Sequence, residues 1–126
     1  MDRVWLGVGG LLGLTGVMMA ALAAHALPGR ISGTDLGFVR TAIEMQMWHA
    51  LALLGCGLLA RQSPGSRRVT LAGAGFTLGT LLFCGAVYSL ALAKTELPAV
   101  APIGGFLTML GWASIASLAW RWPLRP

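Results

Sequence analysis

The side chains most able to do chemistry lie close together in a stretch that is otherwise apolar. Glu44, Gln46 and His49 fall within six residues of one another. Arg40 precedes Glu44 by four residues, a spacing that puts both on one face of a helix and allows a salt bridge. Histidine titrates near physiological pH, so His49 could serve proton or solute handling. The simpler alternative is a buried, neutral, hydrogen-bonded His49 that stabilises the fold.

A metal or haem site is a further hypothesis from the same region. Histidine and methionine can ligate copper or haem iron, and Met45 and Cys56 share a helical stripe with His49. The sequence contains no H-x-x-x-H and no C-x-x-C pair, so we expect no metal and no other cofactor. It also contains no recognisable catalytic triad, phosphate-binding loop or paired-carboxylate site, so we expect no catalytic residue and no enzyme.

Four apolar runs must position these side chains. Of the 126 residues, 56% are hydrophobic and 10% are charged, whereas a soluble domain carries about 25% charged residues. Each run supplies the roughly 20 residues needed to cross about 30 Å of hydrocarbon. Because lipid cannot pair backbone N–H and C=O groups, each run should be helical. The predicted fold is therefore all-α, one membrane-embedded four-helix bundle over residues 1–126, with spans at about 4–27, 41–60, 69–93 and 101–120.

The sequence also predicts whether the first span is retained and where the helix of the second span begins. The first run could be mistaken for a cleavable signal peptide, but it is longer than the 7–15 apolar residues typical of such peptides. We therefore expect it to remain as a span. Thr34 or Asp35 could cap a helix that begins before the second span.

The basic residues lie at the ends of the apolar runs. The net charge is +5, but these residues form no polar, aromatic-interleaved surface, so we expect lipid and no nucleic acid as a partner. The positive-inside rule places the more basic side, with both termini, in the cytoplasm. That side comprises Arg3, Arg61, Arg67, Arg68, Arg121 and Arg125, with Trp5, Trp120 and Trp122 at its interface, and the other side comprises Arg30, Arg40 and Lys94.

Depth along the second span separates an apolar inner half from a polar outer half. With Arg61 at the inner boundary, Glu44 lies about one turn below the outer boundary and His49 about 12 Å below it. Ionisable groups inside a membrane are costly and usually face the protein interior. A carrier or binding protein for a proton, ion, lipid or small solute, using this outer half, is therefore one function hypothesis. Tyr88 would lie near the outer interface, where an interfacial anchor is the simpler role.

Small residues at helical spacing predict close helix packing. Gly9 and Gly13 form one G-x-x-x-G that Gly16 extends, and Gly75 and Gly79 form another. Such faces let helix backbones approach closely in lipid. They could pack within one bundle, or also serve a homo-oligomer or a larger membrane complex. Since no catalytic set is present, our leading hypothesis is a non-enzymatic structural or interaction component.

Four segments spread over the chain resemble a known membrane family. They are 24–27 (AHAL), 40–55 (RTAIEMQMWHALALLG), 79–92 (GTLLFCGAVYSLAL) and 102–105 (PIGG) with Gly111-Trp112. In these segments the chain resembles the bacterial family called domain of unknown function 423, or YgdD-like, whose eukaryotic relatives include transmembrane protein 256. The resemblance implies a four-helix, multi-pass protein of the bacterial inner membrane and no established activity.

The resemblance also bears on single residues. Members of the family can carry Ser where this chain has Cys84 and Gln where it has Arg40, so we expect neither residue to be essential. The paired glycines at the start of the fourth span would allow close backbone approach, in the direction of the Glu44 region. The resemblance and the depth of the polar groups together select one candidate polar cluster: His25, Glu44, Gln46, His49, Tyr88, Gly104 and Gly105.

Overall fold

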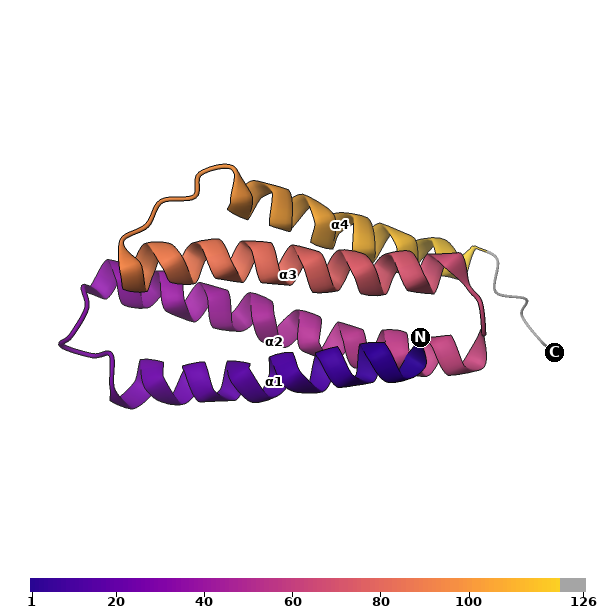
Figure 1. The fold of residues 1–126 in the computed structure, drawn as a ribbon, viewed down its shortest axis with the longest axis horizontal. Helices are drawn as coiled ribbons and strands as arrows, with labels where there is room; N and C mark the ends of the chain where they lie inside the picture. The colour runs from indigo at the N-terminus through magenta and orange to yellow at the C-terminus, as the bar shows by residue number, and fades with distance from the viewer. Residues whose placement is uncertain (121–126) are drawn as a thin grey trace.

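Four long helices make up most of the structure. The computed structural model describes residues 1–120 and contains α1 (Asp2–His25), α2 (Gly33–Gln62), α3 (Arg67–Ala93) and α4 (Val100–Ala119) (Figure 1). All four are long and apolar enough to cross a membrane. The prediction of an all-α protein with four membrane-spanning helices is confirmed. The 30 residues of α2 make it about 45 Å long, so it extends beyond the hydrocarbon layer.

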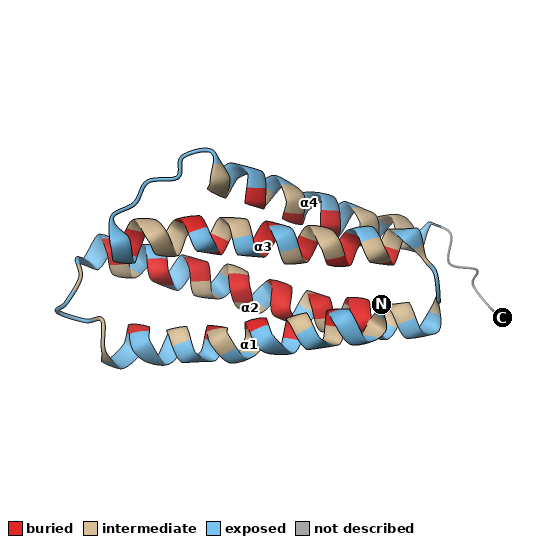
Figure 2. Ribbon diagram, viewed as in Figure 1, coloured by how far each residue is buried: buried red, intermediate tan, exposed pale blue. Residues whose placement is uncertain are grey.

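The helices pack in the order in which they follow one another along the chain. Close backbone contacts join α1 to α2, α2 to α3, and α3 to α4 (Figure 1). Buried residues are therefore concentrated on α2 and α3, which each have two close neighbours (Figure 2). Helices α1 and α4 expose most of their apolar side chains. A bilayer can cover these outer faces, which water could not solvate favourably.

The two ends of the molecule differ in charge. The start of α1, the α2–α3 connection and the end of α4 lie at one end (Figure 1), which we call the basic end because it carries Arg3, Arg61, Arg67 and Arg68. The α1–α2 and α3–α4 connections lie at the opposite end, called the far end. Arg121, Trp122 and Arg125, which the sequence assigns to the basic side, lie outside the described residues.

The far end is closed by contacts between the start of α2 and the end of α3. The N-cap of α2 is Ser32, whose hydroxyl accepts a hydrogen bond from the Asp35 backbone N–H at 3.0 Å. The prediction of Thr34 or Asp35 as the cap is wrong, because α2 begins at Gly33 and both residues lie inside its first turn. The buried Asp35 carboxylate also binds the Lys94 ammonium group, which joins α2 to α3.

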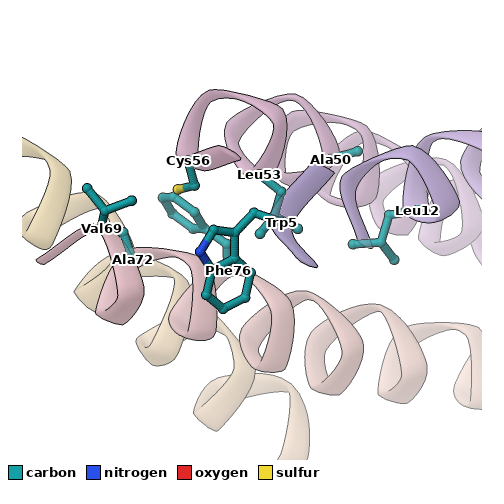
Figure 3. Close-up of a cluster of buried hydrophobic side chains, with 8 residues drawn as sticks. All are labelled: Trp5, Leu12, Ala50, Leu53, Cys56, Val69, Ala72 and Phe76. Carbon is teal, nitrogen blue, oxygen red and sulfur yellow. The ribbon is translucent and has the colours of Figure 1, made fainter. Parts of the chain in front are cut away.

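A hydrophobic core fills the half of the molecule nearer the basic end (Figure 3). The Trp5 ring reaches from α1 to α3, where Gly73 leaves room for it: a Cβ on Gly73 would lie 2.5 Å from that ring. Trp5, which the sequence places at the membrane interface, is therefore 6% exposed and part of the core. The cluster consists of Trp5, Leu12, Ala50, Leu53, Cys56, Val69, Ala72 and Phe76.

Candidate functional site

Gln46 joins three helices through its side-chain amide. Its Nε2 donates to the Leu12 carbonyl at 2.9 Å and to Thr15 Oγ1 at 2.8 Å, both on α1. Its Oε1 accepts a hydrogen bond from the Tyr88 hydroxyl of α3 at 2.9 Å. Gln46 is buried, so these bonds replace the water that the amide would otherwise bind. We call Gln46, its two α1 partners and Tyr88 the Gln46 hub.

His49 joins α2 to α4. Its Nδ1 lies 2.6 Å from the Met45 carbonyl, and Trp112 Nε1 donates to its Nε2 at 3.2 Å. Because an indole N–H can only donate, Nε2 must accept, and the imidazole proton resides on Nδ1. The Phe76 ring lies 5.5 Å from the imidazole, centroid to centroid. Both nitrogens of a neutral His49 are therefore engaged by the protein, and a metal ion could bind Nε2 only by displacing Trp112.

Cys84 makes a further contact between α2 and α3. Its Sγ lies 3.2 Å from the Ala42 carbonyl, and both residues are buried. A thiol is a weak donor, so a serine hydroxyl at this position could make the same bond. Within residues 1–120, no three His, Cys, Asp or Glu side chains are placed to hold one metal ion.

Two members of the candidate polar cluster are exposed, namely His25 and Glu44. Glu44 and Arg40 line a groove of about 260 Å³ between α1 and α2 at the far end, together with small residues of α1 such as Ala20 and Ala24. Among the ion pairs of residues 1–120, none joins Arg40 to Glu44. The predicted salt bridge does not form there, which is consistent with the small free energy that such a pair contributes at an exposed site.

Gly104 marks the closest approach of α3 and α4. A Cβ on Gly104 or on Gly79 would come within 2.7 Å of the carbonyl oxygen of the other glycine. Gly75 lies against α4 in the same way, since a Cβ on it would lie 2.8 Å from the Leu107 carbonyl oxygen. Gly105 has open space, since only Phe83 Cδ2 comes within 4.0 Å. Of the paired glycines, Gly104 therefore packs on α3, away from the Glu44 groove.

The glycines of α1 divide between a packed and an open face. A Cβ on Gly9 would lie 2.9 Å from the Ala50 carbonyl of α2, and one on Gly16 would contact Met47. Gly13 has no atom within 4 Å of that position. Residues seven apart differ by only about 20° around a helix, whereas residues four apart differ by about 40°. Gly9 and Gly16 therefore form the packed pair, and Gly13 lies beside it.

The candidate polar cluster is thus divided by the fold. Gln46 and Tyr88 are hydrogen-bonded to each other, and His49 lies one turn further along α2 with its own partner on α4. Sequence reasoning missed two of the partners, Thr15 and Trp112. For Trp112 the signal was an indole N–H inside an apolar run, which needs a hydrogen-bond acceptor in lipid. Thr15 gave no such signal, because its hydroxyl donates to carbonyls of its own helix and accepts from Gln46. Within the described chain, four surface grooves are lined by other residues, and neither the Gln46 hub nor His49 contributes to them.

Comparison with known proteins identifies similar membrane proteins of bacteria. The model of the family described as protein of unknown function (DUF423) matches residues 19–105. A UPF0382 membrane protein of Haemophilus influenzae is 33% identical over 117 residues, which cover 92% of this chain and 93% of the relative. The UPF0382 inner membrane protein YgdD of Escherichia coli is 33% identical over 89% of this chain and 86% of its own length. YwdK of Bacillus subtilis is 32% identical over 93% and 96%. No solved structure matches the chain.

Proposed function

The chain belongs to the DUF423 family of multi-pass inner-membrane proteins, and we propose that it acts there as a non-enzymatic structural or interaction component. The observation that supports the proposal is the engagement of its deepest polar groups. Both donor hydrogens of the Gln46 amide and both ring nitrogens of His49 are bound by neighbouring helices or by the backbone of α2. A binding or catalytic site needs polar groups that converge on a pocket, and these groups converge on helices instead.

The proposal includes an orientation with both termini in the cytoplasm. At the basic end, Arg3, Arg61, Arg67 and Arg68 lie at the ends of the spans. At the far end the basic residues are Arg30, Arg40 and Lys94, and the sequence adds Arg121 and Arg125 to the other side. This asymmetry supports a cytoplasmic basic end under the positive-inside rule.

The surface that would contact a partner is the α1–α2 face at the far end. Glu44 is exposed on that face, about one turn below the outer boundary, and no ion pair of residues 1–120 includes it. Trp48, one turn further along α2, is 65% exposed. A carboxylate at this depth is costly when it faces lipid and less so when another protein supplies a partner. Contact with a second copy or a larger complex is therefore the favoured use of this face.

A purification in mild detergent tests the proposal. We expect light scattering to show a species larger than the monomer, or a stoichiometric partner, and we expect Glu44→Gln to reduce that assembly. Glu96→Gln is the matched control, because Glu96 is an exposed acid of the α3–α4 connection, away from the groove. Protein that stays strictly monomeric and co-purifies with nothing would count against the proposal.

The Arg40–Glu44 groove supports a second candidate, a carrier or binding protein for a small solute or ion. Its volume of about 260 Å³ and its two charged side chains could hold a small polar ligand. In that case Glu44→Ala should abolish binding or transport in proteoliposomes while the melting temperature stays unchanged. The structural role would be favoured by two results together. Glu44→Ala would keep full binding or transport and an unchanged melting temperature, and His49→Ala would fail to assemble.

A further inference from the structure

A long apolar groove lies between α3 and α4, on a surface that the proposed function does not use. It has a volume of about 490 Å³, and its walls include Leu71 and Leu78 of α3 and Leu107, Leu110 and Ser117 of α4. The ten-residue separation of Leu107 and Ser117 corresponds to about 15 Å along the helix axis. That length is about half of a 30 Å hydrocarbon layer, which is the depth of one leaflet.

Two arginines lie where the groove reaches the basic end. Arg67 and Arg68 are the first residues of α3, and Leu71, one turn further along, lines the groove. Arg68 Nη1 donates to the Ser117 carbonyl at 2.6 Å, which holds its guanidinium at the end of the groove. Arg67 is exposed, and none of the ion pairs of residues 1–120 includes either arginine. The groove therefore combines an apolar surface one leaflet deep with two positive charges, not paired with an acid, at the end nearer the basic end.

We propose that the α3–α4 groove binds an anionic phospholipid of the leaflet at the basic end. One acyl chain lies along the groove, and the headgroup phosphate accepts hydrogen bonds from Arg67 and Arg68. Guanidinium groups bind phosphate oxygens through charge-assisted hydrogen bonds, and basic pockets between membrane helices suit anionic headgroups. Ala113, which also lines the groove, has a small side chain and leaves space for an acyl chain.

A second copy of the chain is a poorer occupant of this groove. Copies related by a two-fold axis along the membrane normal present the same residues at the same depth. The arginines of both copies would then meet at the basic end, where like charges repel each other. An anionic lipid instead supplies the opposite charge at that depth, together with a chain of matching hydrophobicity.

Native mass spectrometry of the purified protein tests the proposal by titration with phosphatidylglycerol and with phosphatidylcholine of identical chains. We expect tighter binding of phosphatidylglycerol. An arginine near an anionic lipid surface contributes about 1 kcal/mol, so the Arg67→Gln/Arg68→Gln double variant should bind phosphatidylglycerol about 30-fold more weakly. Arg67→Gln alone, which leaves the bond of Arg68 to Ser117 intact, should weaken binding about fivefold.

The matched control is Arg3→Gln/Arg61→Gln, which removes two arginines from the same end but away from the groove; its affinity should stay within about twofold of the wild type. Ala113→Phe keeps both arginines and fills the groove, so it should lower the affinity for phosphatidylglycerol. An equal loss of affinity in the two double variants would overturn the proposal, because it would indicate a general charge effect. Unchanged binding by Ala113→Phe, or cross-linking of two copies through the α3–α4 face, would also overturn it.

Discussion

The two helical hairpins of this protein are held together in different ways. In α1–α2, glycine contacts are supplemented by the Gln46 side chain, which binds Leu12 and Thr15. In α3–α4, glycines bring the two backbones together, the Phe76 and Trp112 rings pack against each other with centroids 4.9 Å apart, and one hydrogen bond joins Arg68 to Ser117 at one end. Lipid offers no hydrophobic driving force between helices, so small residues and polar side chains are the two available means of association. The hairpins use these means in different proportions and should therefore respond differently to substitution.

The largest effect should follow from a single methyl group on α4. In Gly104→Ala the new Cβ meets the backbone of α3, which cannot move aside as a side chain can. We expect a loss of about 3 kcal/mol in the free energy of unfolding, at the upper end for overpacking. Reversible unfolding in mixed detergent, followed by circular dichroism, measures it. Gly105→Ala is the control and should change stability by less than about 0.5 kcal/mol, because its Cβ enters open space. Equal effects of the two variants would show that α3 and α4 do not pack as described.

Loss of the Gln46 side chain should have the next largest effect. Gln46→Leu removes three hydrogen bonds and leaves the Tyr88 hydroxyl without its partner. Interhelical hydrogen bonds in membrane proteins average about 0.6 kcal/mol each, so we expect a loss of about 2 kcal/mol in the same unfolding assay. Met47→Leu on the same helix is the control for a change of side-chain shape. An unchanged free energy of unfolding for Gln46→Leu would mean that the Gln46 side chain does not help to hold α1 and α2 together.

A smaller effect is expected at Gly9, where the contact mixes backbone and side chains. In Gly9→Ala the Cβ meets the Ala50 carbonyl at 2.9 Å, but its other neighbours are side chains of Leu53 and Leu54 that can shift. We expect a loss of about 1.5 kcal/mol in thermal unfolding. Gly13→Ala should be close to neutral because no atom lies within 4 Å. If Gly13→Ala were more destabilising than Gly9→Ala, α1 would have to be rotated about its axis relative to the orientation described.

The smallest effect should come from Tyr88→Phe. This change removes one hydrogen bond to Gln46 and keeps the aromatic ring in place. We expect a loss of about 0.6 kcal/mol in the free energy of unfolding. The effect should add to that of Gly104→Ala, because the two sites share no contact. It should not add to that of Gln46→Leu, because that variant removes the same bond. A double-mutant cycle in the unfolding assay measures this coupling. Full additivity of Tyr88→Phe with Gln46→Leu would contradict the hydrogen bond.

Local composition was enough to predict which four segments are long and apolar enough to cross a membrane and at which heights along a span the polar groups lie. Both properties depend on local composition and on the fixed rise of a helix, so four spans and the positions of Gln46 and His49 along α2 could be predicted without knowledge of any neighbour. The resemblance to the family was also local, since it rests on short segments within each span. The helical cap at Ser32 was misplaced by two or three residues, because Ser32, Thr34 and Asp35 are all acceptable capping residues.

The rotation of each helix about its axis and the partners of each polar group depend on contacts between helices. Gln46 takes partners 31, 34 and 42 residues away, and nothing in its neighbourhood along the chain identifies them. Rotation also separates Gly9 from Gly13, and the buried Gln46 from the exposed Glu44 two residues before it. Every span is apolar nearly all round, so hydrophobic periodicity carries little information about which face is inside. The packing of glycines and the pairing of buried polar groups supply that information instead, and both require the neighbouring helices to be in place.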